Sequence, residues 1–316
     1  MRAITAHGPH AFECAVAPTP ALTPGSRLVR VEATGVCAGD RMLWHGTGPW
    51  QVRWPFVPGH EILGRDATTG ERLTAEVKVP CRQCRYCRDG RANLCPSGRH
   101  IGSSLPGGFA ELLVLPPEAL IHPVPDELPR AAAVLAEPMA CALHAVTRAG
   151  VKEGDTVAVI GLGAVGALAV VCARARLASR VLAVVRTSEK AELAERIGAE
   201  PVFAGSADSE GLADAVIECS GDPAGAATAF TLAAPGGRVC LYSVYSGPAT
   251  VDLNQVSEFK ELTVTVGHLA PGCFTEAIGL LAQLPAELHA AEADLADFKR
   301  VLDHPDPSRV KVALVP

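Results

Sequence analysis

The stretch TVAVIGLGAVGALAVVCARA, residues 156–175, decides the fold. It begins with a short, β-branched apolar run over residues 156–160. Gly161, Gly163 and Gly166 follow in the pattern G-x-G-x-x-G, and an alanine-rich helical pattern comes next. A strand, a tight turn and a helix in this order bring a pyrophosphate onto the backbone N–H groups of a helix N-terminus. The stretch therefore predicts a dinucleotide site, and the alternative is a similar fold that binds no nucleotide.

Strand and helix patterns keep alternating after this stretch. RVLAVV at 180–185 is a second apolar run, and the helical pattern SEKAELAERIGA at 188–199 follows it. The strand-like ADAVIECSG (213–221), the helix-like PAGAATAFTLAA (223–234) and two more apolar runs, GGRVCLYSV (236–244) and ELTVTVG (261–267), continue the series. Such alternation predicts an α/β fold with a doubly wound parallel sheet.

Length and composition set the outer limits. At 316 residues the chain has room for two domains, and its 48% hydrophobic and 20% charged residues are typical of a globular protein. A formal net charge of −6 gives no electrostatic attraction to nucleic acid or to an anionic membrane, so we expect small-molecule partners. No apolar run is long enough to span a bilayer and no signal-peptide pattern opens the chain, which predicts a cytoplasmic protein.

Four of the eleven cysteines form one cluster. Their spacing is C-x2-C-x2-C-x7-C, and short turns of this kind bring sulfur atoms together around a tetrahedral ion. Four thiolates complete the coordination shell, so we expect a structural zinc ion that takes no part in chemistry. A disulfide pair and an iron–sulfur cluster are the alternatives. The four residues are Cys81, Cys84, Cys87 and Cys95.

A second set of possible metal ligands is scattered along the chain. Cys37 follows the strand-like run RLVRVEATG, His60 and Glu61 follow a proline-bounded turn, and Glu137 stands at a predicted helix start. One thiolate, one imidazole and one or two carboxylates would leave a zinc position open for water or substrate. Taken singly, each residue has an ordinary structural explanation, as a core thiol, a buried imidazole or a helix N-terminal charge.

These motifs, in this order, resemble the zinc-dependent medium-chain dehydrogenases/reductases, the superfamily of alcohol and polyol dehydrogenases. GVCAGD, PGHE, the four-cysteine segment, GGFAELLVLP, LAEPMACALHA, GLGAVG and ECSG extend over most of the chain. The resemblance implies a Rossmann domain and a mainly β, GroES-like catalytic domain. We expect the catalytic domain at 1–140 with a zinc lobe at 80–96, the Rossmann domain at 141–269, and a return to the catalytic domain at 270–316.

The resemblance also implies a role for each site residue. Cys37, His60 and Glu137 would be ligands of a catalytic zinc ion, Glu61 would enter or leave its coordination shell, and Asp40 would support the ligands. The four clustered cysteines would hold a second, structural zinc ion. The implied contacts to the nicotinamide cofactor are Gly161, Gly163, Ala164, Val165, Gly166, Val185, Arg186 and Ser220.

The activity implied is hydride transfer between a secondary alcohol or ketone and a nicotinamide cofactor. CAGD followed by WHG, and AEPMACALHAV, are most similar to polyol dehydrogenases that act on tetritols, related sugar alcohols or cyclitols. Proteins of this kind are usually dimers or tetramers. The alternatives are a catalytically silent, NADP(H)-binding zinc protein that acts as a sensor or structural partner, and a zinc-free quinone or enone reductase. Residues expected to line the substrate pocket are Trp44, Trp50, Trp54 and His268.

Two positions depart from the family pattern. Members commonly have Ser or Thr two residues after the first cysteine, where its hydroxyl relays the substrate proton, but this chain has Gly39. Many also have His five residues after that cysteine, where this chain has Met42. Our hypothesis is that Glu61, His45 or Thr47 takes the proton instead; the alternative is that the site has lost its activity.

Cofactor choice follows from the end of the second strand. NAD-binding units of this type carry an acidic residue about 20 positions beyond the glycines, where it accepts hydrogen bonds from the ribose 2′-OH. Here Val185 stands at that place and Arg186 follows. Without a carboxylate a 2′-phosphate is not repelled, and Arg186 can bind it. The sequence therefore favours NADP(H); the alternative is that Arg186 lies over the adenine of NAD.

Overall fold

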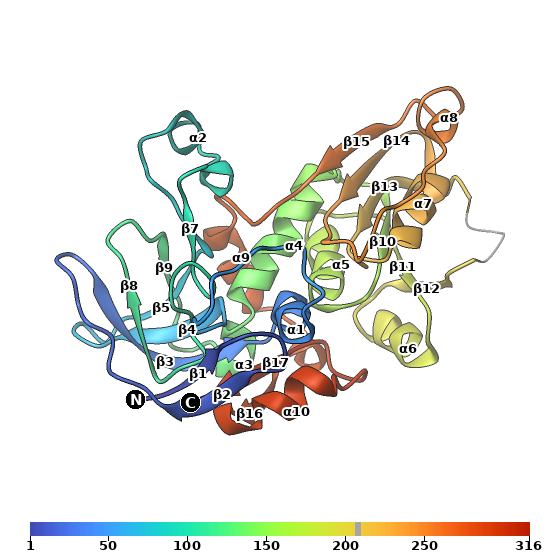
Figure 1. Ribbon diagram of the computed structural model, residues 1–316. Helices are drawn as coiled ribbons and strands as arrows, with labels where there is room; N and C mark the ends of the chain where they lie inside the picture. The colour runs from blue at the N-terminus through green and yellow to red at the C-terminus, as the bar shows by residue number, and fades with distance from the viewer. Residues whose placement is uncertain (206–209) are drawn as a thin grey trace. The chain divides into compact units, whose positions relative to one another are not determined.

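The computed structural model describes residues 1–205 and 210–316, which form two compact units (Figure 1). The first unit is Met1–Glu137, Leu269–Gln283 and His289–Pro316. The second is Pro138–His268 with Leu284–Leu288. The sequence led us to expect one uninterrupted return to the first unit after residue 269, whereas a five-residue segment of that stretch groups with the second unit.

The second unit is built on a six-stranded sheet in which every strand pair is parallel. The strand order is β12-β11-β10-β13-β14-β15, so the first strand of the unit, β10, lies in the middle of the sheet. This confirms the expected doubly wound α/β fold. The strands are β10 (Thr156–Ile160), β11 (Arg180–Val185), β12 (Glu200–Phe203), β13 (Ala213–Glu218), β14 (Ala233–Leu241) and β15 (Thr263–Val266).

Three helices connect these strands and pack against the sheet. They are α5 (Ala164–Ala175), α6 (Ser188–Arg196) and α7 (Pro223–Leu232). Caps fix where they begin, because Thr187 accepts a hydrogen bond from the N–H of Lys190 and Asp222 accepts one from that of Ala224. The core between sheet and helix α7 is made of small and branched side chains, among them Ala158, Val216 and Phe230.

The first unit holds a mainly antiparallel sheet with strand order β16-β17-β3-β4-β5-β9, and β8 pairs with β3. Within it the C-terminal strand β17 pairs with β3, which in turn pairs with β4, so three distant parts of the sequence lie side by side. This register brings the site residues together. The strands are β3 (Arg27–Gly35), β4 (Glu61–Asp66), β5 (Arg72–Ala75), β8 (Leu112–Leu115), β9 (Ile121–Pro123), β16 (Ala291–Asp294) and β17 (Val312–Val315).

An aromatic core lies beside this sheet. A hairpin of β1 (Arg2–Ala6) and β2 (Phe12–Val16) contributes to it, together with helices α1 (Ala38–His45) and α10 (Phe298–Asp303). The Trp44 ring meets those of Phe12 and Phe298 edge-on, with ring centroids 5.1 and 6.2 Å apart. Burying such rings stabilises the unit beyond the area that they remove from water.

The zinc lobe predicted at 80–96 is a closed loop. Two short strands, β6 (Lys78–Val79) and β7 (Arg99–His100), pair at its base, and it contains helix α2 (Arg85–Arg88) and a 3-10 turn (Ala92–Leu94). The remaining elements are α3 (Arg130–Ala133), α4 (Ala136–Arg148), α8 (Leu253–Val256), α9 (Phe274–Leu281) and the 3-10 turns Ala286–Leu288 and Leu295–Asp297. Within the described ranges, no helix combines the length and apolarity that a bilayer crossing requires.

Candidate active site

Cys37 lies at the junction between strand β3 and helix α1, where it is the N-cap residue. Its backbone N–H donates to the Oδ2 atom of Asp40 at 2.8 Å. Asp40 is almost completely buried, so this bond fixes the direction in which the helix, and with it the thiol, leaves the sheet. The Asp40 carboxylate thus lies against the backbone N–H of Cys37 and supports that residue at the start of α1.

His60 and Glu61 enter from the neighbouring strand. Glu61 begins β4 and pairs with Gly35 of β3, two residues before Cys37. The ligand atoms of Cys37, His60 and Glu61 all lie within 4.8 Å of one another. Thiolate, imidazole and carboxylate are the groups that bind zinc in open, catalytic sites, and Glu61 Oε2 is buried with no hydrogen-bond partner among the described residues. The three side chains therefore fit a zinc ion.

Lys311 is a buried neighbour of this group that the sequence analysis missed. Its Nζ atom donates to Glu61 Oε1 at 2.6 Å and to the carbonyl oxygen of Val36 at 3.1 Å. Burial alone would lower the pKa of Lys311, but the charges of Glu61 and Cys37 outweigh it and raise the pKa. The sequence holds one signal of this role: Lys311 stands between Val310 and Val312 just before the last strand, where a solvent-exposed charge is not expected.

Asp40 and His60 are electrostatically coupled. His60 Nδ1 lies 3.9 Å from Asp40 Oδ1, and the Asp40 carboxylate is nearly inaccessible to water. Burial opposes a charge on His60, yet the hydrogen bond to Cys37 and the negative charges of Asp40 and Glu137 raise the pKa of His60 well above its ordinary value. The charge of His60 is thus coupled to those of Cys37, Asp40 and Glu137.

Glu137, the third ligand implied by the family resemblance, lies in the first turn of helix α4 and is buried. It is outside the group whose ligand atoms lie within 4.8 Å of one another. Its charge nevertheless acts on both His60 and Lys311 and raises the pKa of each. The structure thus places Glu137 near the group, at a longer range than Glu61.

Gly39 leaves room for an aromatic ring beside Cys37. A Cβ atom on Gly39 would meet Trp50 Cη2 at 3.5 Å and Cys37 Sγ at 3.9 Å, which are ordinary contact distances. Trp50 is 43% exposed, so its indole is an accessible aromatic surface beside Gly39. Sequence reasoning noticed the missing hydroxyl at this position but had no means of showing which side chain lies over it.

Two of the three residues proposed as proton acceptors, His45 and Thr47, lie at or just beyond the C-terminal end of helix α1, whereas Cys37 lies at its N-terminal end. Cys37 caps the start of the helix and His45 is its last residue, so the helical rise separates them by about 12 Å. Thr47 follows the helix, and its N–H donates to the carbonyl oxygen of Met42. Of the three candidates, Glu61 alone is beside Cys37.

The expectation that Trp44 lines a substrate pocket is wrong. Trp44 is 3% exposed and its Nε1 atom donates to Asp303 Oδ1 at 2.5 Å, because its ring fills the aromatic core. Trp54 is also turned toward that core and stacks on Phe56, with ring centroids 4.9 Å apart. His268 belongs to the second unit, where its charge acts on His144.

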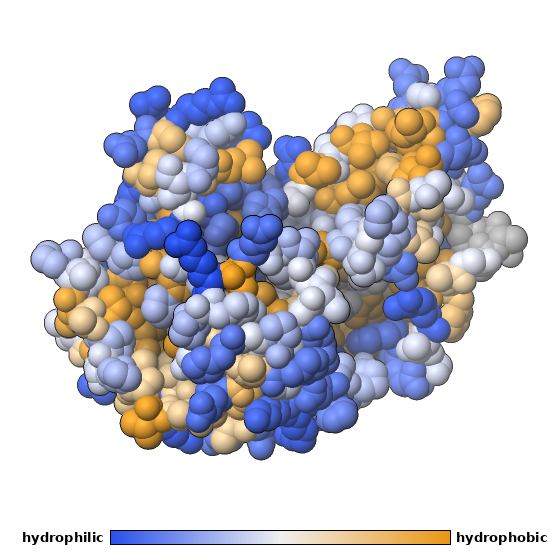
Figure 2. Space-filling view, in the orientation of Figure 1, coloured by the Kyte–Doolittle hydropathy of each residue, from blue (hydrophilic) through white to orange (hydrophobic). Residues whose placement is uncertain are grey.

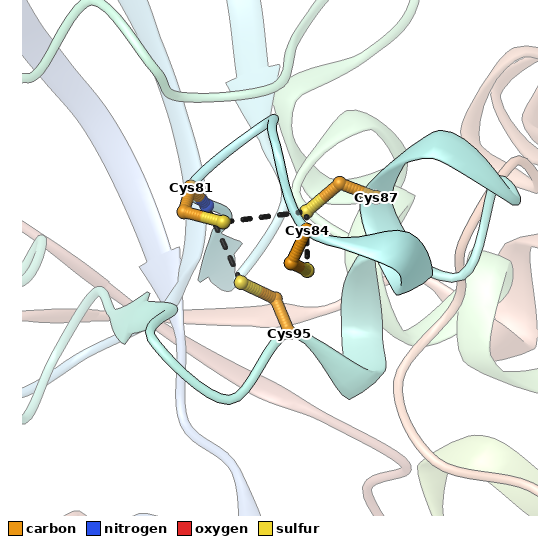
Figure 3. A group of neighbouring side chains, drawn as sticks. All are labelled: Cys81, Cys84, Cys87 and Cys95. Carbon is orange, nitrogen blue, oxygen red and sulfur yellow. Dashed lines mark hydrogen bonds between the residues drawn. The ribbon is translucent and has the colours of Figure 1, made fainter.

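The four clustered cysteines face one another in the lobe (Figure 3). Cys84 Sγ lies 3.5 Å and Cys81 Sγ 3.9 Å from Cys87 Sγ, and the N–H of Cys81 donates to Cys95 Sγ at 3.3 Å. Sulfur atoms around a tetrahedral zinc ion with bonds of 2.3 Å are about 3.8 Å apart. None of the four thiols forms a disulfide, and the distances between their sulfur atoms fit a zinc ion.

The contacts in the lobe favour the thiolate form of Cys81 even without a bound cation. Backbone N–H groups of Gln83 and Cys84, with a further bond from Cys95, lower the pKa of Cys81 from 9.0 to about 6. Burial and the neighbouring thiols raise the pKa of Cys87 to about 12, since sulfur atoms packed this closely cannot all be charged without a counterion. A divalent cation removes that conflict.

The glycine turn of the second unit is shaped for close approach. Gly161 has φ of 86°, and a Cβ atom there would lie 2.6 Å from Ser220 Cα; a Cβ atom on Gly166 would lie 1.9 Å from the Gly161 carbonyl oxygen. Gly163 caps helix α5 and no atom lies within 4 Å of its Cβ position, so its surface is open. Ala164 and Val165 are the first helical residues. The turn fits a pyrophosphate at the N-terminus of α5.

The other implied cofactor contacts follow the adjacent parallel strands. Val185 ends β11, and the exposed Arg186 after it forms an ion pair with Asp222 at 3.1 Å. Asp222 stands in the loop after β13 and was missed in the sequence. The same loop contains Ser220, whose N–H donates to Glu218 Oε1 at 2.7 Å.

Glu218 anchors that loop. It is fully buried at the end of β13, and its carboxylate accepts hydrogen bonds from the Ser220 hydroxyl and, at 2.6 Å, from Tyr245. Burial and the Glu218 charge raise the pKa of Tyr245, which keeps the phenol protonated as a donor. The switch point of the sheet between β10 and β13 is thus bordered by Gly161 and by a loop held in one conformation.

Two family models match the chain. One describes an alcohol dehydrogenase GroES-like domain and matches residues 23–126; the other describes a zinc-binding dehydrogenase and matches residues 164–283. An erythritol/L-threitol dehydrogenase of Mycolicibacterium smegmatis is 33% identical over 100% of this chain and 98% of its own length. An L-threonine 3-dehydrogenase of Bacillus subtilis is 31% identical over 78% of this chain and 77% of its own length.

A solved structure is similar over the whole chain. It is a zinc-binding dehydrogenase of Sinorhizobium meliloti bound to NADP, with a TM-score of 0.90 and 29% identity. The similarity covers 100% of this chain and 99% of that one.

Proposed function

Because this chain belongs to the zinc-dependent medium-chain dehydrogenases/reductases, we propose that it transfers a hydride between a nicotinamide cofactor and a secondary alcohol or ketone of a polyol, sugar alcohol or cyclitol. The observation that carries the proposal is the convergence of Cys37, His60 and Glu61, with ligand atoms within 4.8 Å of one another. Thiolate, imidazole and carboxylate are the groups that bind zinc in open, catalytic sites, and Glu61 Oε2 has no hydrogen-bond partner among the described residues.

Cys37, His60 and Glu137 would hold the catalytic zinc ion in this proposal, with Glu61 as an alternative ligand. A zinc ion bound there supplies Lewis acidity that polarises a substrate oxygen, while the nicotinamide supplies the hydride chemistry. Asp40 holds the N-cap and faces His60, so it orients two ligands at once. Such supporting groups raise the basicity of the ligands and fix their geometry.

Lys311 sets the position of Glu61. Its ion pair at 2.6 Å draws Oε1 of the carboxylate toward the C-terminal strand and leaves Oε2 without a partner among the described residues. A carboxylate held in this way can accept the substrate proton where Gly39 supplies no hydroxyl. We therefore favour Glu61 over His45 and Thr47 as the acceptor.

The substrate class is supported by one relative and one side chain. The similar protein of M. smegmatis is named for erythritol and L-threitol, two four-carbon polyols. Trp50 offers an accessible aromatic face beside Gly39, two residues after Cys37, and aromatic rings of this kind accept the C–H faces of small polyhydroxylated molecules. We propose tetritols as the first substrates to test.

We propose NADP(H) as the cofactor, and Arg186 as the residue that binds the 2′-phosphate. Its side chain is 77% exposed, and the similar S. meliloti protein binds NADP. Asp222 competes with the phosphate for the same guanidinium. Arg186→Ala should therefore weaken NADP(H) far more than NAD(H), and Asp222→Ala should strengthen NADP(H). Equal effects on both cofactors in either variant would contradict the assignment.

We further propose that the lobe of Cys81, Cys84, Cys87 and Cys95 holds a second, structural zinc ion. We also propose that the protein is cytoplasmic and forms a homo-oligomer. None of the eleven cysteines, all of which lie in the described part of the chain, forms a disulfide, which favours a reducing compartment. Strand β15 ends the parallel sheet, and Val264 and Val266 are exposed on it. Figure 2 shows hydrophobic side chains gathered over β14 and β15, a surface that a second copy can cover.

The test is the absorbance of the reduced cofactor during turnover. Zinc-loaded protein is screened against tetritols, pentitols, hexitols, inositols and aminocyclitols with NADP⁺ and NAD⁺, and simple alcohols serve as controls. We expect turnover with polyols, tetritols first, and preference for NADP⁺. Silence across the panel, in protein that binds zinc and cofactor, would favour the non-catalytic alternative of a zinc-bound sensor or structural partner.

A further inference from the structure

Two histidines and an aspartate meet on the first unit at a place that the dehydrogenase reaction does not use. His10 belongs to the turn between β1 and β2, His45 is the last residue of α1, and Asp303 is the last residue of α10. Their ligand atoms lie within 4.8 Å of one another. In the described part of the chain, only three groups reach this closeness, and the other two are the zinc lobe and the group around Cys37.

The three side chains are organised by one buried residue, Trp44. Its Nε1 atom donates to Asp303 Oδ1 at 2.5 Å, and its carbonyl oxygen accepts the N–H of His10 at 2.8 Å. His45 is the next residue in the same helix. Because Trp44 is fixed in the aromatic core, the backbone of His10 and the carboxylate of Asp303 are held in place by an element that cannot move freely.

The arrangement brings one donor atom from each side chain into the same small region. The indole bond uses Asp303 Oδ1 and leaves the second carboxylate oxygen available, as in many metal sites where a ligating carboxylate also accepts a hydrogen bond. The His10 and His45 rings meet edge-on with centroids 5.2 Å apart. His10 has φ of 55°, in the left-handed region, and its bond to Trp44 maintains that conformation.

The chemistry of the set selects the class of cation. Two imidazoles and one carboxylate suit zinc and its neighbours among the first-row transition metals, and they are poor ligands for calcium or magnesium. A tetrahedral ion with bonds of 2.0–2.1 Å needs donors about 3.4 Å apart. The two imidazoles are exposed, so small rotations of their rings close the remaining distance while Asp303 keeps its hydrogen bond to Trp44.

Arg41, the arginine nearest to His45 in the sequence, makes its contacts elsewhere. The guanidinium of Arg41, one helical turn before His45, donates to the carbonyl oxygen of Val301 at 3.5 Å. Its charge interacts with Asp40, Cys37 and Glu61, toward the opposite end of α1. The three-residue cluster therefore carries a single negative charge when its imidazoles are neutral.

We propose that His10, His45 and Asp303 bind a divalent transition-metal ion, with zinc as the preferred ion. The ion would tie the turn between β1 and β2 to the C-terminal ends of helices α1 and α10. Three protein ligands leave positions for water, so the site is expected to exchange its ion more readily than the closed lobe. The bound ion would hold the N-terminal hairpin reversibly against these two helices.

The test is calorimetric titration of Zn²⁺ into protein that has been loaded with zinc and then desalted. Wild-type protein should bind one further equivalent and melt at a higher temperature when it is bound. His45→Ala should weaken this step by at least about tenfold. Asp303→Asn should do the same, although its amide oxygen can still accept the Trp44 hydrogen bond.

His304→Ala is the matched control, because His304 is an exposed histidine next to Asp303 and outside the cluster. It should bind the further equivalent as wild type does. Circular dichroism checks that each variant is folded, and His45→Gln replaces His45→Ala if the latter is not. No further equivalent in wild type, unchanged binding in the His45 and Asp303 variants, or an equal loss in His304→Ala would overturn the proposal.

Discussion

Lys311 shows how much of the candidate site depends on one buried residue. With Glu61 it forms an ion pair in which both side chains are less than 5% exposed. Removing one partner of such a pair leaves an uncompensated buried charge, whereas removing both does not. The free energy of unfolding lost on substituting Lys311 therefore depends on whether the charge of Glu61 remains. Comparing a single and a double variant tests this.

Lys311→Met is expected to lower the free energy of unfolding of the first unit by about 3 kcal/mol. The double variant Lys311→Met, Glu61→Gln should recover most of the loss. The raised pKa of Lys311 means that its contribution is complete below the ordinary lysine value of about 10.4 and is lost only as the pH rises through the higher folded value, so the wild-type ion pair is complete at about pH 7, where the variants are compared. Urea unfolding measures it; a double variant as unstable as the single one would contradict the ion-pair account.

Gly39 yields a second prediction at the residue scale. A Cβ atom fits there at ordinary contact distances from Trp50 and Cys37, so Gly39→Ser should fold normally. If the missing hydroxyl limits proton transfer, kcat should rise by about tenfold or more, because general acid–base catalysis is worth at least that much. Gly39→Ala is the matched control, since it adds the same Cβ atom without a hydroxyl. Equal rates in the two variants would show that proton transfer does not limit turnover.

Single residues were read from the sequence with uneven success. Cys37, His60 and Glu61 were recognisable because their residue types and flanking motifs are unusual. Lys311 was not, because its importance arises from strand β17 pairing with β3, a contact that local sequence does not reveal. Trp44 was misassigned for a related reason: an aromatic residue next to a site motif gives no sign of which face of its helix meets the core.

At the scale of elements, the zinc lobe is the one whose chemistry depends most on pH. The pKa of Cys81 falls from 9.0 to about 6 in the folded lobe. A lowered folded pKa contributes stability that is complete above the unfolded value and lost as the pH falls through the folded one. Protons compete with zinc for the four thiolates, so we expect the lobe to hold zinc at pH 8 and to lose it on acidification.

Zinc release against pH, followed with a chromogenic chelator, measures this directly. Cys95→Ser should lower the zinc content by one equivalent at pH 8, while Cys273→Ser, a cysteine outside both groups, should not change it. Zinc that stays bound to the lobe at pH 4 would show that the thiolates are held by more than the contacts described.

Strand β15 is the element on which the proposed assembly depends. Val266→Lys places a charge on the outer edge of the parallel sheet, where the native side chain is 63% exposed. We expect the molar mass measured by light scattering to fall to that of one chain. Val16→Lys changes a more exposed valine, on β2 of the first unit, and should leave the mass unchanged. Wild-type protein that is already monomeric would contradict the proposed oligomer.

The bounds of strands could be predicted from the sequence more readily than the contacts between side chains. The strands at 27–35, 156–160 and 180–185 have the boundaries that their apolar runs predict, because β-branched runs bounded by turn residues leave little freedom. The ion pair between Arg186 and Asp222 was not predictable. It joins loops that follow different strands, and only the order β11-β10-β13 brings them to one edge of the sheet.

For the whole molecule, one glycine-rich unit and a set of ordered motifs were enough to identify the fold class. The family models and full-length relatives confirm that assignment. What the sequence left open is the chemistry that depends on fine position: which group takes the proton, which cofactor is preferred, and which polyol fits beside Trp50.

The most direct test of the account is the joint measurement of zinc content and polyol oxidation in wild-type protein and in Cys37→Ser. We predict about two tightly bound zinc ions per chain and turnover in wild type, and the loss of about one ion together with all turnover in the variant. Turnover that survives Cys37→Ser, or wild-type activity with zinc in the lobe alone, would contradict the proposal that Cys37, His60 and Glu137 form the catalytic zinc site.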